Sequence, residues 1–178
     1  EKQFGIGGVD ADFFNSTAGL RGFKGSVYEG GLRVPMIVRL PGTVPAGVTN
    51  DTPSYFADWF PTLCSAFELE NTTAPDGDDL WPAIRGKSTS ANRKPMVWIY
   101  PEYGGQVAVN FGDMKLVRQR LNSRKPGPWE VYNLADDPRE TTNIADENPD
   151  IVAKAMAILK KETDSNELFP VTIPGVND

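Results

Sequence analysis

The sequence predicts an α/β fragment from the edge of a larger sheet, followed by an α+β unit with a four-stranded antiparallel sheet and a C-terminal helix. Three patterns support this fold class. An apolar run with β-branched residues at 36–38 lies between a proline and a Pro-Gly turn, which is typical of a buried strand. From residue 94 the apolar positions form short strand-like runs between turns, and the last long periodic stretch is helical. We therefore divide the chain into residues 1–90, with an anion loop, a buried strand and helices, and residues 91–178.

Length and composition allow one ordinary domain with a hydrophobic core. The 178 residues are 39% hydrophobic and include four Trp, five Tyr and nine Phe, while 15 Pro and 17 Gly indicate many loops. The formal charge of −6 and the lack of a basic stripe argue against a nucleic-acid partner, because phosphate binding depends on clustered Lys and Arg. No apolar run is long enough to cross a bilayer, so we expect no membrane partner.

The chain contains no histidine, which removes the most common general acid-base group and every imidazole metal ligand. Its one cysteine, Cys64, lies in an apolar stretch without a neighbouring cation that would lower the pKa of the thiol. We expect a buried structural cysteine there. A Ser-His-Asp or Cys-His site cannot be built from this chain alone.

A glycine-rich loop precedes the predicted strand at 36–38. Four glycines between residues 22 and 31 allow positive φ angles or a close approach of the backbone to a neighbouring group, and Lys24 lies among them. A cation in such a loop, next to a strand, predicts an anion-binding site.

Helical signals follow the predicted strand. Thr52 and Pro53 provide an N-cap and a first turn for a helix with one apolar face that we expect to pack inward, formed by Phe56, Trp59, Phe60, Leu63 and Phe67. Pro61 interrupts this pattern, and we expect it to separate a short first helix from a second helix that begins at Pro61 itself. A further helical turn is expected at 80–84.

The second half of the chain alternates between strand and turn signals. We expect strands at 96–100, 107–111, 114–117 and 129–134. A final helix begins at Asn148 and Pro149, and its apolar stripe should cover one face of the sheet. Residues 169–174 indicate an extended tail on the surface.

Residues 21–35, R-G-F-K-G-S-V-Y-E-G-G-L-R-V-P, resemble the R-G-x-K-x-x-x-x-E-G-G-x-R-x-P segment of the sulfatase family. Further matches follow in the order of the family: D-W-F-P-T-L at 58–63, D-G-D-D-L at 76–80, and the segments 104–109, 112–118 and 131–145, which resemble its C-terminal subdomain. The order and spacing of these motifs make the resemblance specific from residue 12 to the end of the last predicted helix.

This resemblance implies a fold similar to that of alkaline phosphatase and the hydrolysis of sulfate esters, in particular those of a sulfated carbohydrate. Lys24 matches the family lysine that contacts the sulfate group, where an ammonium can neutralise charge on the sulfuryl oxygens as the ester bond breaks. Glu29 and Arg33 are expected to support the loop through hydrogen bonds and a charge pair. Tyr103 and Gln106 are candidates for substrate contact, with a plain hairpin loop as the alternative.

The resemblance also implies groups that are missing from this chain. The family nucleophile is a formylglycine made from Cys or Ser in a C/S-x-P-x-R motif, which the surroundings of Cys64 do not match. Calcium in the intact family enzyme is held partly by an Asp-Asn pair, and no such pair precedes Lys24. We therefore expect the C-terminal part of a sulfatase, with no metal site of its own and inactive alone. Its apolar edge at 36–38 would be covered by the missing N-terminal portion or by another copy. The family resemblance implies a periplasmic, secreted or lysosomal location.

Two other functions stay open from the sequence. The lack of a nucleophile, a histidine and a metal cluster also suits a non-catalytic glycan-binding or interaction module. A phosphoester hydrolase of the same superfamily is the third reading, although the lysine-containing E-G-G segment favours sulfate over phosphate.

Overall fold

The computed structural model describes residues 10–70, 74–87, 93–164, 167–168 and 171–177. The chain forms two compact units. The first unit combines residues 1–33 with residues 97–178, and the second consists of residues 34–96. The predicted boundary at residue 90 therefore lies close to the end of the second unit, but the glycine-rich loop belongs to the unit that contains the sheet.

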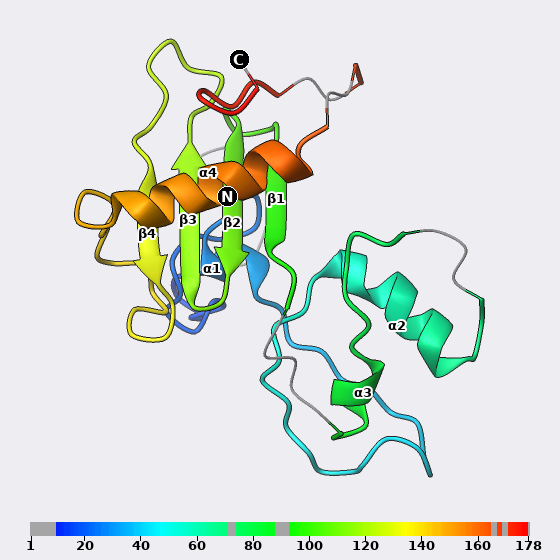
Figure 1. The fold of residues 1–178 in the computed structure, drawn as a ribbon. Helices are drawn as coiled ribbons and strands as arrows, with labels where there is room; N and C mark the ends of the chain where they lie inside the picture. The colour runs from blue at the N-terminus through cyan, green and yellow to red at the C-terminus, as the bar shows by residue number, and fades with distance from the viewer. Residues whose placement is uncertain (1–9, 71–73, 88–92, 165–166, 169–170, 178) are drawn as a thin grey trace. The chain divides into compact units, whose positions relative to one another are not determined.

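The first unit is built on a four-stranded sheet with the order β1-β2-β3-β4 (Figure 1). Its strands are β1 (Met96–Tyr100), β2 (Gln106–Phe111), β3 (Met114–Gln119) and β4 (Glu130–Asn133). The pairs β2–β3 and β3–β4 are antiparallel. All four predicted strands are confirmed, with ends that differ by a few residues. The tight turn between β2 and β3 uses Gly112 at a φ of 62°, which glycine adopts with little strain.

One face of this sheet packs against helix α4 (Pro149–Glu162). Alternate residues of the strands point to the same side, and those on this side include Val109, Leu116 and Val131, all fully buried. The helix contributes Ala155 and Leu159 to the same core, and Figure 1 shows it crossing the sheet. The predicted helix and its place over one face of the sheet are confirmed.

The end of the chain also packs into this core, which corrects the prediction of a surface tail at 169–174. Residues 169–170 lie outside the described part, but Ile173 is fully buried and Val176 is nearly so. A turn places both side chains on the core, because the backbone N–H of Val176 donates to the carbonyl of Ile173 and the amide oxygen of Asn177 accepts the N–H of Ile173. The sequence pattern missed this because two apolar side chains in a turn have no period.

The opposite face of the sheet carries the glycine-rich loop. Ala108, Val117 and Tyr132 point to this side and form a second core cluster with Val27 and Tyr28. The loop then enters the one-turn helix α1 (Glu29–Leu32), which lies behind the sheet in Figure 1. The sheet thus has a long helix on one face and the predicted anion loop on the other.

The second unit contains the short 3-10 helix η2 (Phe56–Asp58), α2 (Trp59–Ala66) and α3 (Trp81–Ile84). Two helices do follow each other, but the second begins at Trp59 and not at Pro61. Proline is tolerated in the first turn of a helix because that backbone N–H has no intrahelical acceptor. The single turn predicted at 80–84 is confirmed, and Cys64 is buried as expected.

Asp58 organises the second unit. Its carboxylate accepts the backbone N–H groups of Tyr55 and Asp78, and it forms an ion pair with Arg93 at 2.5 Å. Gly77 packs so closely on this turn that an added Cβ would lie 2.4 Å from the backbone of Ala57. The D-x-x-P-T-L and D-G-x-x-L motifs are therefore the two halves of one structural contact.

Two predictions for the second unit are wrong. Residues 36–38 form no strand, and Ile37 is 92% exposed. The apolar positions of η2 and α2 do not pack inward either, since Phe56 is 94% exposed and Phe60, Leu63 and Phe67 are also exposed. A strand needs a neighbour for its backbone groups, and no strand in the described part of the chain pairs with residues 36–38. The structure therefore has exposed apolar side chains at 36–38 in place of the predicted strand edge.

Candidate functional site

Lys24 lies in a hydrogen-bonded turn at the surface of the first unit. The N–H of Ser26 donates to the carbonyl of Phe23 at 3.0 Å, and Gly22 and Gly25 have φ angles of 82° and 87°. The Lys24 side chain is exposed and forms no ion pair with a described residue. An ammonium in this position can meet an anion from outside the unit.

The two glycines of the E-G-G segment are required by close backbone contact. The N–H of Gly30 donates to the carbonyl of Arg21 at 2.7 Å. A Cβ at Gly30 would lie 2.3 Å from the carbonyl oxygen of Gly22, and a Cβ at Gly31 would lie 2.1 Å from that of Ser26. The loop around Lys24 is therefore wrapped directly on the backbone of α1.

Glu29 connects α1 to the sheet through a buried ionic cluster. Its carboxylate pairs with Arg33, the residue that follows α1, and with the ammonium of Lys115 on β3, at 2.7 Å for Lys115. Lys115, which is 0% exposed, also lies 2.8 Å from Glu140, whose second oxygen accepts the backbone N–H of Glu29 at 2.7 Å. Glu29 therefore joins the loop to β3, and the predicted charge pair between Glu29 and Arg33 is present.

The two carboxyl groups of this cluster differ in their pKa. Burial disfavours the charged form of both. At Glu29 the ion pairs with Lys115 and Arg33 outweigh burial, and the pKa lies below its ordinary value. At Glu140 burial outweighs the attraction of Lys115, and the pKa lies above its ordinary value. Glu29 is the better-compensated carboxylate, as expected for the partner that has two cations.

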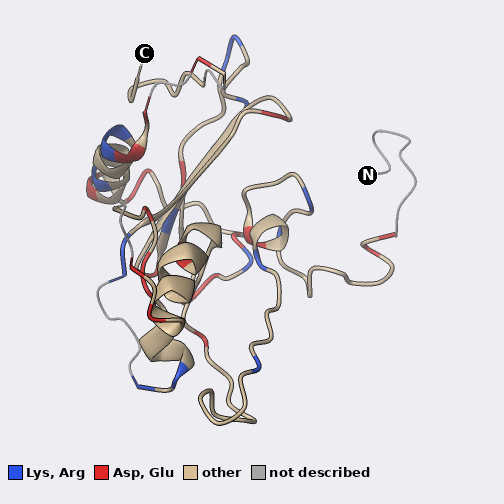
Figure 2. Ribbon diagram, turned by 90° about the vertical axis from the view of Figure 1, so that its right-hand side faces the viewer, with Lys and Arg blue, Asp and Glu red and all other residues tan. Residues whose placement is uncertain are grey.

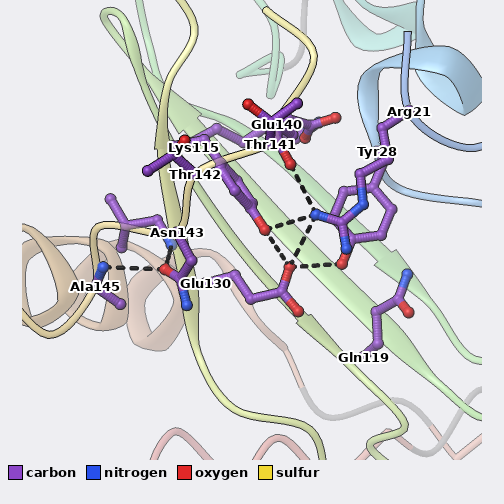
Figure 3. Close-up of polar contacts among 12 residues, drawn as sticks. Arg21, Tyr28, Lys115, Gln119, Glu130, Glu140, Thr141, Thr142, Asn143 and Ala145 are labelled. Carbon is purple, nitrogen blue, oxygen red and sulfur yellow. Dashed lines mark hydrogen bonds and ion pairs between the residues drawn. The ribbon is translucent and has the colours of Figure 1, made fainter. Parts of the chain in front are cut away.

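Arg21 forms a second polar cluster at the start of the loop (Figure 3). Its guanidinium lies 3.8 Å from the centre of the Tyr28 ring, donates to the hydroxyl of Tyr132 at 2.7 Å and to the carbonyl of Glu140 at 2.9 Å. The hydroxyls of Tyr28 and Tyr132 both donate to one oxygen of Glu130, at 2.6 and 2.5 Å. Burial, followed by the hydrogen bond to Glu130, raises the pKa of both phenols.

The segment after β4 holds Glu140 in place. Asp137 accepts the backbone N–H groups of Thr141 and Thr142, and these hydrogen bonds outweigh burial and lower its pKa. Asn143 accepts the N–H groups of Val131 and Ala145 through its side-chain oxygen, and Figure 3 shows its contact with Ala145. The D-P-R-E-T-T-N motif is thus a scaffold that presents Glu140 to α1.

The two candidate substrate residues differ in exposure. Tyr103 is 54% exposed, and its ring stacks on Tyr100 with 5.9 Å between ring centres. The edge of the ring also packs on Gly25, since a Cβ added to that glycine would lie 3.0 Å from Cε2 of Tyr103. It therefore lies beside the Lys24 turn. Gln106 is 3% exposed and its amide is bonded to the backbone of the same turn, so the structure does not place it at a substrate surface.

Charges of both signs are interspersed in the described chain, and Figure 2 shows Lys and Arg in short, separate segments. The described residues contain no group of three or more Asp, Glu or Cys side chains arranged to hold a metal ion. None of the helices described is both long and apolar enough to span a membrane.

The sheet, its covering helix and the lysine loop match the C-terminal region of sulfatases. The family model for the C-terminal region of N-sulphoglucosamine sulphohydrolase matches residues 22–166. The chain belongs to this family, and the solved structures that it resembles include sulfatases with the alkaline-phosphatase-like fold.

Individual relatives agree with this assignment. The chain is 31% identical to a sulfatase of Formosa agariphila over 158 residues, which are 80% of this chain and 28% of that protein. It is 31% identical to the N-acetylglucosamine-6-O-sulfatase of Bacteroides thetaiotaomicron over 68% of this chain and 23% of that protein. A solved structure in complex with its substrate D-glucosamine-2-N,6-O-disulfate matches with a TM-score of 0.58 and 26% identity, over 70% of this chain and 27% of that one. The chain spans about a quarter of the length of these relatives.

Several residues that build the site carry no role predicted from the sequence: Arg21, Lys115, Glu130, Tyr132 and Glu140. Lys115 had a usable signal. It lies in an apolar strand, and its side chain points to the same side as Val117, which must be buried against the loop. A lysine at such a position requires an acidic partner. The identity of that partner depends on contacts across many residues of sequence, which a single sequence does not reveal.

Proposed function

We propose that this chain is the C-terminal part of a sulfuric-ester hydrolase that acts on a sulfated carbohydrate, with Lys24 in contact with the sulfate group. The observation that carries the proposal is the exposed Lys24 turn, which a buried ionic cluster at Lys115 and a partly buried polar cluster at Arg21 hold against the sheet. The family assignment supports sulfate as the anion. A relative named N-acetylglucosamine-6-O-sulfatase and a solved neighbour bound to a disulfated glucosamine support a sulfated sugar.

In this proposal Lys24 acts by electrostatic stabilisation. Negative charge on the sulfuryl oxygens changes as the S–O bond breaks, and a preorganised ammonium lowers the energy of the transition state. The Lys24 turn is fixed by backbone contacts, so little reorganisation is needed when the substrate binds. Tyr103 lies beside this turn and offers an aromatic face, which suits contact with a sugar ring.

The nucleophile and the metal ion are assigned to residues outside this chain. Cys64 is buried in the second unit and lies outside any C/S-x-P-x-R motif. The described residues do not fit a calcium site, so no step of the reaction is assigned to calcium on this chain. We therefore expect the chain to be inactive alone.

The partner that we propose for the second unit is the remaining portion of a sulfatase. Its uncovered apolar side chains come from the segment after α1 and from η2 and α2 with the residue that follows: Val34, Met36, Ile37, Phe56, Phe60, Leu63 and Phe67. Exposed apolar side chains in this number favour contact with another polypeptide. The matched part is 28% and 23% of the length of two relatives, so each has enough further chain to supply the cover.

An aryl sulfate assay on two proteins tests the proposal. The first is the isolated 178-residue chain, and the second is a chimera in which this chain replaces the matched segment of the Formosa agariphila sulfatase. We expect no turnover by the isolated chain and measurable turnover by the chimera. Turnover by the isolated chain would contradict the assignment of the nucleophile to residues outside it.

A non-catalytic glycan-binding module is the second candidate, and the stacked pair of Tyr100 and Tyr103 favours it. Binding of sulfated glycans to the isolated chain on a glycan array distinguishes the two functions. Binding that persists after Lys24→Ala but is lost after Tyr103→Ala supports the binding module. Loss of binding after Lys24→Ala supports the role of this lysine in sulfate recognition.

A further inference from the structure

Gln106 is the first residue of β2, and both ends of its side-chain amide are bonded to the Lys24 turn. Its Nε2 donates to the carbonyl of Gly25 at 2.8 Å, and its Oε1 accepts the N–H of Val27 at 3.3 Å. These two backbone groups lie one and three residues after Lys24. The side chain therefore bridges the second half of the turn.

The sheet fixes the amide of Gln106. Gln106 pairs with Gln119 across β2 and β3, and the Nε2 of Gln119 donates to the Oε1 of Gln106 at 3.1 Å. The side chain is 3% exposed, so water competes little for these bonds. The turn is thus tied to a paired position of the sheet and not only to its own backbone.

We propose that Gln106 is a positioning residue that sets the place of Lys24 for contact with the sulfate group. This inference rests on the proposed function, because it assigns Gln106 an effect on the reaction through Lys24. Gln106 touches the backbone on the C-terminal side of Lys24, and Tyr103 packs on the same glycine from the solvent side. Together they hold Gly25 between a buried amide and an aromatic ring.

The chemistry of the contact requires an amide. The carbonyl of Gly25 needs a donor and the N–H of Val27 needs an acceptor, and a glutamine side chain supplies both. A glutamate of the same length keeps the acceptor but faces the carbonyl of Gly25 with a second acceptor. A leucine of similar size removes both bonds, so the buried N–H of Val27 and the partly buried carbonyl of Gly25 lose this partner.

Hydrogen exchange of backbone amides in the isolated chain provides the first test. Ser26 is the informative residue, because its N–H donates to the carbonyl of Phe23 and does not touch Gln106. We expect the exchange rate at Ser26 to rise at least about tenfold in Gln106→Leu and in Gln106→Glu. Loss of a buried hydrogen bond of this kind should raise the equilibrium constant for local opening of the turn roughly tenfold. Amides in the β3–β4 ladder should keep their protection.

Asn110→Ala is the matched control, because Asn110 lies on the same strand and the same side of the sheet as Gln106. It should leave exchange at Ser26 unchanged. Unchanged exchange at Ser26 in both Gln106 variants would overturn the proposal. So would a loss of protection throughout β3 and β4, because that result assigns Gln106 to the stability of the sheet.

A double-mutant cycle in the chimera tests the effect on the reaction. Gln106→Leu should lower kcat/KM for an aryl sulfate roughly ten- to a hundredfold, the range expected when a group is displaced by about 1 Å. In a Lys24→Ala background the same change should alter kcat/KM less than about twofold. Equal losses in both backgrounds would show that Gln106 does not act through Lys24. If Lys24→Ala itself leaves the rate unchanged, the proposed function fails, while the exchange result still decides whether Gln106 holds the turn.

Discussion

At the scale of single residues, Lys115 joins the glycine-rich loop to the sheet. Its buried ammonium lies between the carboxylates of Glu29 and Glu140, which come from α1 and from the segment after β4. A buried cluster of charged side chains adds little net stability compared with apolar residues of similar volume in the same places. Removal of one charged side chain, however, leaves the opposite charges buried without a partner. The cluster therefore specifies which segments meet, and breaking it is costly.

The first prediction concerns Lys115. Lys115→Met should lower the free energy of unfolding by about 3–5 kcal/mol, because two buried carboxylates lose their shared cation. Urea unfolding followed by circular dichroism measures this change. The exposed Lys160→Met serves as the control and should stay within about 0.5 kcal/mol of the parent chain. A loss below about 1 kcal/mol in Lys115→Met would contradict the cluster, and Glu140→Gln in the same background should recover part of a larger loss.

The second prediction concerns alkaline pH. The pKa values of Tyr28 and Tyr132 are raised in the folded chain from an ordinary value of 10.0. Above pH 10 the unfolded chain therefore loses protons that the folded chain keeps, and stability falls as the pH rises. Below pH 10 the contribution of both phenols is fully present. The opposite pKa shifts of Glu29 and Glu140 act against each other at acid pH, so the alkaline limb is the informative one.

Thermal unfolding between about pH 8 and pH 11 tests the predicted loss of stability at alkaline pH. This range extends from about two pH units below an ordinary phenol pKa to about one above it. Tm should decline above pH 10 in the parent chain, with a shallower decline in the variants Tyr28→Phe and Tyr132→Phe. An equally steep decline in parent and variants would assign the alkaline loss to other groups.

At the scale of elements, α1 is too short to be stable alone and exists because the loop is wrapped on it. The sequence motif alone identified its glycines as places of positive φ or of close approach. In the structure the four glycines are required for different reasons. Gly22 and Gly25 have positive φ angles, whereas at Gly30 and Gly31 a Cβ would collide with backbone carbonyl oxygens. Which reason applies to which glycine depends on tertiary contact, so the sequence left both open.

The third prediction separates these two reasons. Gly31→Ala should lower the free energy of unfolding by several kcal/mol or displace the loop, because its Cβ would lie 2.1 Å from the carbonyl oxygen of Ser26. Gly112→Ala is the control, since its Cβ meets nothing within 4 Å and only its φ of 62° is strained, at a cost of about 1–2 kcal/mol. Urea unfolding compares the two variants. Equal losses would contradict the close contact between loop and helix.

Strands and helices with a clear apolar periodicity could be predicted from the sequence. Segments whose position depends on tertiary contacts could not. The four strands and the final helix follow from alternation and from the stripe on α4. The buried turn at Ile173 and the outward face of α2 do not, because an apolar residue at the right spacing carries no information on what lies against it. The same limit applies to the candidate site: its motif predicts Lys24 as the sulfate contact, whereas the sequence gives no sign that the Gln106 side chain lies beneath the turn.

At the scale of the whole molecule, the two units differ in how completely they bury apolar groups. The first unit has two core clusters, one on each face of its sheet. The second exposes side chains such as Ile37 and Phe56 almost completely. This contrast supports the proposal that the first unit is largely self-sufficient and that the second is covered by the rest of a sulfatase.

The fourth prediction follows from this contrast. A triple variant with Phe56→Gln, Phe60→Gln and Phe67→Gln should reduce self-association and dye binding of the isolated chain, because exposed apolar area drives both. Stability should change by less than about 1 kcal/mol, since these side chains are already exposed. Analytical ultracentrifugation and urea unfolding measure the two effects. A large loss of stability would show that the side chains pack within the isolated chain.

The same substitutions should have the opposite consequence in the chimera with the Formosa agariphila sulfatase. There the proposed cover is present, so the apolar side chains should be buried and their replacement should destabilise the protein. Equal stability of the chimera with and without the three substitutions would contradict the proposed cover.

The central claim is that Lys24 belongs to a sulfate-ester site completed by residues outside this chain. The most direct measurement is the steady-state rate of aryl sulfate hydrolysis by the chimera with Lys24 and with Lys24→Ala, beside the control Lys160→Ala. We expect Lys24→Ala to lower kcat/KM about a hundredfold or more, comparable to the removal of one charge-stabilising donor, and Lys160→Ala to leave it unchanged. An unchanged rate in Lys24→Ala, in a chimera that folds and turns over substrate, would contradict it.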